Sequence, residues 1–435
     1  MEQELIIWIA AFWFVLFLVL GQNVATVLFA TGMLGIFLWV GPHVFRGILA
    51  RDIFYTASTY SLSIIPLYLL MAQLLLRGGV IVDLFRVGYR LSGYRRFPLG
   101  IATVISGGLL GAVSGSGAAT SAALATLASP QLEQVGYTRR MAVALAAIAG
   151  SLSAIIPPSL IMIIYGSLTQ VSIGHLFIGA LVPAVVCILV YIVCLRLFGE
   201  VTPGAVDGQQ GSEQGVTVET SSLAAFGFVV LLMVVVFGGI YGGVVTAGEA
   251  GAIGAFTALV GMLAMRRIGA RDIATALSES VKVTAMLMII VLGAQIFGRF
   301  LSYSRIPHEV LGLLQPLLDN PELVVAILLA VFFLFGLFLE SAAVMVLLIP
   351  IMMPILRAAE VDLLWFGVMA SFMISLGLLT PPVGLAAYAA SSAARHPVGP
   401  VFRITGVFAL FAAVLVTALM VLFPDLVTWL PSTIR

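Results

Sequence analysis

Long apolar runs are the feature that most limits how this chain can fold. Stretches long enough to cross a bilayer, which takes roughly 20 residues in a helix, recur along the 435 residues. Only 9% of the residues are charged, against about 25% in a soluble globular chain. Backbone polar groups in hydrocarbon need partners within their own segment, so such runs cross as helices. We therefore expect an all-α polytopic membrane protein. The expected spans are 4–21, 23–43, 54–76, 142–168 and 175–198, followed by 223–241, 247–265, 283–301, 361–392 and 399–424.

A polar segment at 201–222, free of Lys and Arg, predicts a linker between two halves, 1–200 and 223–435. Each half has about five spans. Because five is an odd number, the second half is expected to cross the membrane in the opposite direction. Each half also holds one longer apolar stretch, 98–132 or 322–357, which predicts a re-entrant helical hairpin.

The basic residues orient this arrangement in the membrane. With re-entrant hairpins, 14 of the 20 Lys and Arg residues share one face, and an excess of these residues marks the cytoplasmic side. The N-terminus is then expected to be periplasmic. The basic segments 77–97 and 266–282 are expected to form amphipathic helices along the cytoplasmic surface; solvated loops are the alternative.

Two Pro-Pro pairs indicate an internal repeat. Pro381-Pro382 follows Pro157-Pro158 by 224 residues, and the same offset relates Ser116 to Glu340. A Pro-Pro pair removes two backbone donors and disfavours helix at the residue before it. We therefore predict broken helices within 142–168 and 361–392. Inverted repeats with broken helices near the midplane are the design of secondary transporters. Ordinary proline kinks are the alternative.

The stretch GAVSGSGAAT at 111–120 lies at the centre of the first predicted hairpin. Glycines allow a tight turn and close backbone approach, and Ser114 and Ser116 supply hydroxyl oxygens. We interpret this stretch as a hairpin tip that meets a cation. Small-residue helix packing, which Gly107 and Gly111 would serve, is the alternative.

The order of these motifs resembles the large, DctM-like (M) membrane subunit of the tripartite ATP-independent periplasmic (TRAP) transporters. The resemblance runs from about residue 30 to 425. It rests on Ser-Gly-Ser-Gly-Ala-Ala-Thr at 114–120, Ile-Pro-Pro-Ser at 156–159, SIGHLFIGALVP at 172–183, IYGGVVTAGEAGAIGAF at 240–256, FLES at 338–341 and LLTPPVGLAAY at 378–388.

This resemblance implies Na⁺-coupled uptake of an organic acid by an elevator movement in the bacterial inner membrane. The acid would be a C4-dicarboxylate, sialic acid or a similar carboxylate. A periplasmic binding protein would deliver it, and a small four-span subunit would brace the large one. A stand-alone Na⁺/anion symporter with similar hairpins, needing no binding protein, is the alternative.

The resemblance also implies where ligands bind. Na⁺ would sit where each hairpin tip meets the broken helix of its own half, and the substrate would lie between the tips. The Na⁺ residues carried over are Ser114, Ser116, Ala154, Ile155, Ile156, Glu340 and Thr380; the substrate residues are Ser116, Gly117, Pro158, Ser341, Pro382 and Arg299.

Three charged residues lie deep in the expected spans, and intramembrane charge marks function by default. Arg299 is expected either to clamp a substrate carboxylate or to reach the outer interface. Glu340 either helps to hold a cation or caps the second hairpin helix. Glu249 is expected to fix a helix end in the scaffold.

Other functional classes fit less well. The chain has no Walker-type phosphate loop, so we expect an ion gradient rather than ATP to drive transport. An intramembrane serine protease would need Gly two residues before Ser114, where Ala112 stands, and a histidine in mid-span. We expect no catalysis.

Overall fold

A computed structural model of the chain describes residues 3–93, 95–203 and 220–433. These residues form helices, joined by short connections and one isolated bridge between Tyr137 and Val201. Eight of the described helices are long and apolar enough to cross a membrane. The structure therefore confirms the predicted all-α polytopic class. The predicted linker lies mostly outside the described residues.

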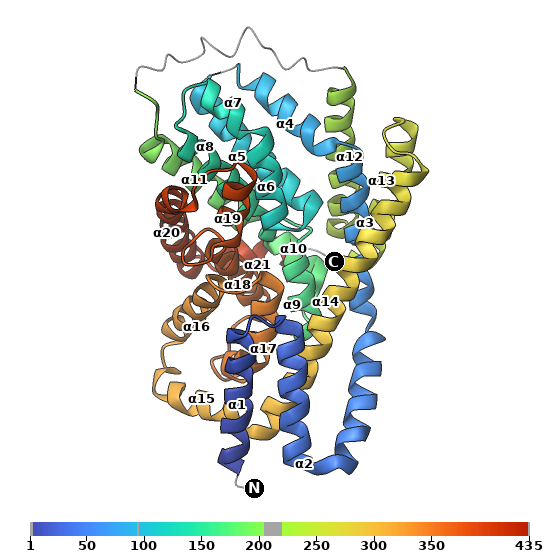
Figure 1. The fold of residues 1–435 in the computed structure, drawn as a ribbon, viewed down its shortest axis with the longest axis vertical. Coiled ribbons are helices and arrows are strands. Elements are labelled where there is room, and N and C mark those ends of the chain that lie inside the picture. Colours follow the sequence, from blue (N-terminus) through green and yellow to red (C-terminus); the bar gives the residue numbers. More distant parts are fainter. Residues whose placement is uncertain (1–2, 94, 204–219, 434–435) are drawn as a thin grey trace.

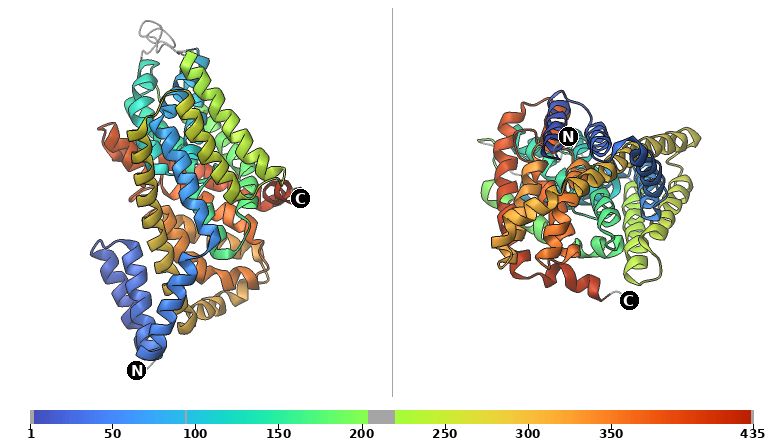
Figure 2. Two further views of the ribbon diagram at one scale, coloured as in Figure 1. Left: turned by 90° about the vertical axis from the view of Figure 1, so that its right-hand side faces the viewer. Right: turned by 90° about the horizontal axis from the view of Figure 1, so that it is seen from below.

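The first two helices lie at one end of the long axis, and α4 (Val80–Leu91) and α12 (Thr220–Tyr241) lie at the other (Figures 1 and 2). Helix α1 spans Gln3–Val19, and α2 spans Val24–Ala57 with a break at Gly41, where φ is 76°. This left-handed conformation suits glycine, and Pro42 follows it directly. The chain reverses at this point and continues as helix to Ala57 (Figure 1). The predicted span 23–43 thus ends correctly, but the third apolar span begins later than 54.

The two basic segments fold differently. Within 77–97, α4 forms a separate helix, Val80–Leu91, which buries Leu84 and Phe85. The predicted surface helix at 266–282 is wrong, because residues from Ala270 onward are the first turns of one long helix, α14 (Ala270–Ser304). A helix does not end where its side chains change from polar to apolar if no Pro interrupts its backbone. The first turn of α14 is also capped, because the Asp272 carboxylate accepts from the Gly269 amide.

Each half contains one helical hairpin and one broken helix. The hairpins are α5 (Arg96–Ser114) with α6 (Gly117–Leu127), and α16 (Pro321–Gly336) with α17 (Ser341–Ala358). The first broken helix is α8 (Arg139–Ser151), η2 (Leu152–Ala154) and α9 (Leu160–Thr169); the second is α18 (Leu363–Gly377) and α19 (Leu385–Ala393). Both breaks contain the Pro-Pro pairs, and both Pro-Pro bonds are cis.

The helix bounds repeat at the offset found in the sequence. Helices α6 and α17 begin at Gly117 and Ser341, 224 residues apart, and α8 and α18 begin at Arg139 and Leu363 with the same separation. The Ser375 hydroxyl donates to the Ser151 carbonyl at 2.6 Å, across the same interval of 224. A residue that contacts its own counterpart lies where the two halves cross. The opposite orientation of the halves in a membrane stays a prediction.

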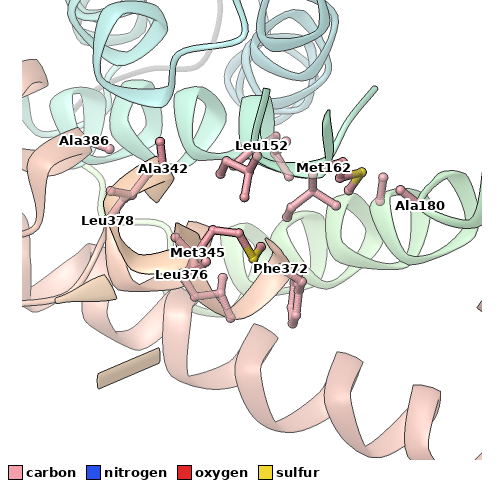
Figure 3. Packing of buried hydrophobic residues seen from close by; sticks show 14 of the residues in the cluster. Leu152, Met162, Ala180, Ala342, Met345, Phe372, Leu376, Leu378 and Ala386 are labelled. Atoms are coloured by element: carbon pink, nitrogen blue, oxygen red, sulfur yellow. The ribbon is translucent and has the colours of Figure 1, made fainter. Parts of the chain in front are cut away.

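The core lies at this crossing. Every residue of α8 from Met141 is buried, as is α18 from Trp365 to its end. Leu152 of η2, Met345 of α17 and Phe372 of α18 belong to the same apolar cluster (Figure 3). The hairpins pack crosswise, α6 against α19 and α17 against α9.

A second group of helices lies along one side of this core (Figure 1), with α2 and α3 packed along α14, and α13 against α3. The remaining described helices are η1 (Tyr60–Ser63), α3 (Ile64–Arg77), α7 (Ser129–Gln134), α10 (Ile173–Gly179), α11 (Leu181–Phe198), α12 (Thr220–Tyr241), α13 (Ala247–Ala264), α15 (Ile306–Leu314), η3 (Gln315–Leu317), α20 (Val398–Leu422) and α21 (Asp425–Ser432).

Candidate functional site

Both hairpin tips open onto one cavity of about 450 Å³. Helices α3 and α14 form its opposite wall. The lining residues are Leu69, Ala72, Gln73 and Leu76 of α3; Val283, Met286 and Leu287 of α14; Gly115 to Thr120 and Ala123 of the first hairpin; Glu340, Ser341 and Ala342 of the second; and Ala154, Leu160, Ile161, Leu378 and Leu385 of the broken helices. The cavity therefore lies between the crossed core and helices α3 and α14.

The first tip is a two-residue turn that a glycine makes possible. Gly115 ends α5 with φ at 65°, a conformation that other residues rarely adopt. Ser116 then caps α6, and its hydroxyl oxygen accepts from the Ala119 amide at 3.4 Å. The Ser114 side chain lies outside the described part of the structure. The predicted hairpin turn thus falls at residues 115 and 116.

The neighbouring glycines serve close packing as well. A Cβ added at Gly107 would come within 2.4 Å of Ala149, and one added at Gly111 within 2.3 Å of Ser153. Helix α5 therefore lies directly against α8 and η2. The two interpretations of this glycine-rich stretch, tip and small-residue packing, both hold in one hairpin.

Ser153 is a candidate residue that the sequence analysis missed. Its side chain is fully buried, and its hydroxyl has no hydrogen-bond partner among the described residues. Most buried polar groups are paired, so such an orphan needs an explanation. A Cβ built on Gly117 would lie 3.3 Å from this hydroxyl oxygen and 3.6 Å from the Gly150 carbonyl oxygen. Two oxygens thus converge beside the first tip.

The sequence held a weak signal for Ser153. It stands four residues before Pro157, in the turn where the broken helix loses its regular hydrogen bonds. Unwound backbone of this kind is where transporters hold cations. The predicted residue Ala154 lines the cavity, whereas Ile155, Ile156 and Pro158 do not.

At the second tip Glu340 both caps a helix and faces the cavity. Its carboxylate accepts from the Ala342 amide at 2.9 Å at the start of α17. The two roles expected for Glu340 are therefore geometrically compatible. The Thr380 hydroxyl donates to the Leu376 carbonyl at 2.9 Å, and neither Thr380 nor Pro382 lines the cavity.

The electrostatics of the cavity come from two helix starts and one carboxylate. Helices α6 and α17 both begin at its wall, and the N-terminus of a helix carries partial positive charge and free amide donors. Among the lining residues Glu340 is the only ionisable one. Two oriented helix starts favour an anion between the tips, and the oxygens beside them favour a cation.

Arg299 lies outside the cavity at the hairpin tips. Its guanidinium donates two hydrogen bonds to the Asp52 carboxylate, at 2.7 and 2.8 Å. The pair lines a separate cavity of about 380 Å³ between α2 and α14. The structure thus gives Arg299 a protein carboxylate as partner, and its role in substrate binding stays a prediction.

Glu249 forms a capping box with Thr246 at the start of α13, as expected for a scaffold residue.

Comparisons with known proteins agree with this architecture. Residues 11–427 match the family model described as "Tripartite ATP-independent periplasmic transporter, DctM component". The C4-dicarboxylate TRAP transporter large permease protein DctM of Pseudomonas aeruginosa is 30% identical over 88% of this chain and 87% of its own length.

The names of two further relatives state substrates other than C4-dicarboxylates. The sialic acid TRAP transporter large permease protein SiaM of Vibrio cholerae is 29% identical over 86% of each chain. The ectoine TRAP transporter large permease protein TeaC of Halomonas elongata is 26% identical over 95% of this chain and 96% of its own.

Among solved structures, the YdaH transporter of Alcanivorax borkumensis shares the fold, with a TM-score of 0.66 at 15% identity over 88% of this chain and 89% of that one. The family match covers nearly all of the described helices, both hairpins and both broken helices. The chain belongs to the DctM family, the large membrane permeases of tripartite ATP-independent periplasmic transporters.

Proposed function

We propose that this protein carries out Na⁺-coupled uptake of an organic acid across the bacterial inner membrane. The acid is a C4-dicarboxylate, sialic acid or a similar carboxylate, handed over by a periplasmic binding protein. A small four-span membrane subunit completes the transporter. The names of the DctM and SiaM relatives support the substrate class. The observation that carries the proposal is one cavity onto which two hairpin tips and their helix starts open.

The residues beside the first tip fit a Na⁺ ion. A hard cation takes oxygen ligands, and unwound carbonyls at broken helices supply them in transporters. The orphan hydroxyl of Ser153, the Gly150 carbonyl and the tip backbone at Gly117 meet this requirement. Bound Na⁺ would satisfy the buried Ser153 oxygen and hold the tip against α8, which shapes the adjacent substrate cavity.

The substrate carboxylate would lie between the tips. There the amide groups at the starts of α6 and α17 can donate to its oxygens. Ser116, Gly117 and Ser341 are the predicted substrate residues that line this cavity. Glu340 is the one lining acid, so a bound cation near it would remove its repulsion for an anionic substrate.

Movement would follow from the division into two bodies. Hairpins and broken helices interlock, α6 with α19 and α17 with α9, so they would move together. Helices α2, α3, α13 and α14 would form the stationary scaffold. Sliding the first body along the second would carry the cavity from one side of the membrane to the other.

Uptake into proteoliposomes tests this proposal. The vesicles hold the chain with its small subunit, and the binding protein and Na⁺ gradient are supplied or omitted separately. We expect uptake only when both are present. Full uptake without a binding protein would instead identify a stand-alone symporter, and uptake without Na⁺ would refute the ion coupling.

Ser153→Ala tests the cation site. We expect the Na⁺ concentration for half-maximal uptake to rise by roughly tenfold, as for the loss of one good interaction of about 1.4 kcal/mol. Ser167→Ala is the matched control, because Ser167 is also buried but donates to the Ile163 carbonyl of its own helix at 2.8 Å. An equal effect of both substitutions on Na⁺ dependence would argue against a ligand role for Ser153.

A further inference from the structure

The cavity of about 380 Å³ between α2 and α14 lies outside the cavity at the hairpin tips. Every described residue that lines it has a polar or charged side chain. Such walls offer no surface to a hydrocarbon chain, so the cavity suits a small polar ligand rather than a lipid tail. The lining residues are Arg51, Asp52, Tyr55 and Thr56 of α2, Thr59 just after its end, and Gln295 and Arg299 of α14.

This cavity has a surplus of positive charge. Two arginines and one aspartate line it, and the aspartate is already paired, because the Arg299 guanidinium donates two hydrogen bonds to Asp52. In the described part of the chain Arg51 forms no ion pair. Its guanidinium lies 5.4 Å from the centroid of the Tyr55 ring, a cation–π contact that holds the charge in place. One cationic group of the cavity is therefore without an anionic partner.

Thr56 gives an independent sign of a ligand. It is only 8% exposed and lines the cavity, yet its hydroxyl has no hydrogen-bond partner among the described residues. The neighbouring Thr59 hydroxyl, by contrast, donates to the Tyr55 carbonyl at 3.0 Å. Because buried polar groups are nearly always paired, the Thr56 hydroxyl calls for a partner inside the cavity. That partner would lie beside the surplus positive charge.

We propose that this cavity binds a carboxylate of the transported acid, with Arg51 as its cationic partner and the Thr56 hydroxyl as a second donor. Hydrogen bonds from arginine to a carboxylate are among the strongest in proteins. Arginine has more N–H donors than the two that Asp52 accepts, so Arg299 also keeps donors for the ligand. The inference rests on the proposed function for the identity of the acid.

The position of the cavity suits a site that the acid occupies before it reaches the hairpin tips. Helix α14 begins at Ala270, in the basic segment expected at the cytoplasmic face, and Gln295 and Arg299 lie near its other end. The cavity would thus face the periplasmic half, where the binding protein delivers the acid. Along α14, Gln295 lies eight residues beyond Leu287 of the tip cavity, or roughly 12 Å of helix.

Protection of introduced cysteines from a maleimide tests this inference on the full chain in detergent. The native Cys187 and Cys194 are replaced by alanine. Thr59→Cys reports on this cavity and Ala119→Cys on the cavity at the tips. The probes are succinate and sialic acid, each with Na⁺ present or replaced by choline. We expect an acid to slow the labelling of Thr59→Cys in both buffers and that of Ala119→Cys only with Na⁺, because the proposed Na⁺ ion shapes the tip cavity alone.

The outcomes separate this inference from the proposed function. Protection of Ala119→Cys with Na⁺, but of Thr59→Cys in neither buffer, would overturn the inference and leave the proposed function intact. Protection of Thr59→Cys alone would support the inference and count against the proposed site at the tips. Protection of Thr59→Cys by inorganic phosphate but by neither acid would overturn the assignment of a carboxylate ligand.

Arg51→Gln, added to Thr59→Cys, tests the cationic partner. The acid concentration for half-maximal protection should rise roughly tenfold, as for the loss of one charged hydrogen bond. Arg271→Gln is the matched control, because Arg271 is exposed and lines neither cavity. Equal effects of the two substitutions would overturn the role of Arg51, since they would show only a general attraction of the surface for anions. If Arg51→Gln fails to fold, protection of Thr59→Cys alone still decides whether an acid binds.

Thr56→Val tests the second donor, because it removes the hydroxyl and keeps the shape of the side chain. The half-protecting concentration should rise roughly fivefold, as for one neutral hydrogen bond. The control is Thr169→Val: Thr169 is 7% exposed, and its hydroxyl donates to the Tyr165 carbonyl at 2.8 Å. An unchanged concentration in Thr56→Val would contradict the contact between Thr56 and the acid.

Discussion

Single glycines set how closely the first hairpin approaches the core. A Cβ at Gly150 would lie 2.1 Å from the Ser121 hydroxyl oxygen and 2.5 Å from the Ser121 backbone nitrogen. Because the second atom belongs to the backbone of α6, no side-chain rotation relieves the clash. We expect Gly150→Ala to destabilise the protein by about 1–3 kcal/mol, the usual cost of overpacking. Thermal unfolding of the purified chain in detergent measures this.

Gly227→Ala is the matched control for this substitution. Gly227 lies inside α12, where an added Cβ meets nothing within 4 Å. Alanine is favoured over glycine within a helix by about 0.5–1 kcal/mol, so this variant should be as stable as the wild type or slightly more so. Equal losses in both variants would contradict the inference that the contact of α6 with α8 at Gly150 causes the effect.

At the scale of elements, the buried ion pair of Asp83 with Arg267 connects α4 to the turn between α13 and α14. Their side chains are 6% and 16% exposed. Removing one partner of a buried pair leaves the other charge uncompensated, which costs about 3–5 kcal/mol. We expect Asp83→Leu to lower the unfolding temperature strongly, and Asp83→Leu with Arg267→Met to restore part of the loss.

The exposed pair of Lys282 with Glu279 provides the comparison. Its side chains are 67% and 38% exposed, and exposed pairs contribute about 0–1 kcal/mol. Lys282→Ala should therefore leave the unfolding temperature nearly unchanged. A double variant at Asp83 and Arg267 that is no more stable than the single variant would contradict the coupling between the two side chains.

Local rules explain which elements the sequence predicts well. Gly115 with its positive φ and the Pro-Pro pairs act on their immediate neighbours, so the hairpin turn and both broken helices were predictable. The pairing of Arg299 with Asp52 was not, because the two lie 247 residues apart in the sequence. The orphan hydroxyl of Ser153 exists only once α5, α6 and η2 have packed together. The continuity of α14 does not follow from side-chain polarity, because its change from polar to apolar residues falls inside one helix.

At the scale of the whole molecule, the proposed elevator movement assigns the hairpins and broken helices to one body and α2, α3, α13 and α14 to the other, and residues from both line the cavity at the hairpin tips. Gln73 of α3 and Ala119 of α6 line this cavity from opposite bodies, whereas Ala119 and Leu385 belong to the same body, since α6 packs against α19. If the bodies slide, a covalent link between the first two positions should abolish uptake, and a link between the second two should not.

Cysteine pairs joined by a bifunctional thiol reagent provide the test. The two native cysteines, Cys187 and Cys194, are buried and would be replaced by alanine in the background. In that background, Gln73→Cys with Ala119→Cys, once fully cross-linked, should reduce Na⁺-driven uptake to the level of empty vesicles. Ala119→Cys with Leu385→Cys places the same reagent in the same cavity, so it controls for blocking of the site. Undiminished uptake by the linked first pair would refute the sliding movement, because the two bodies could not then be the parts that move past each other.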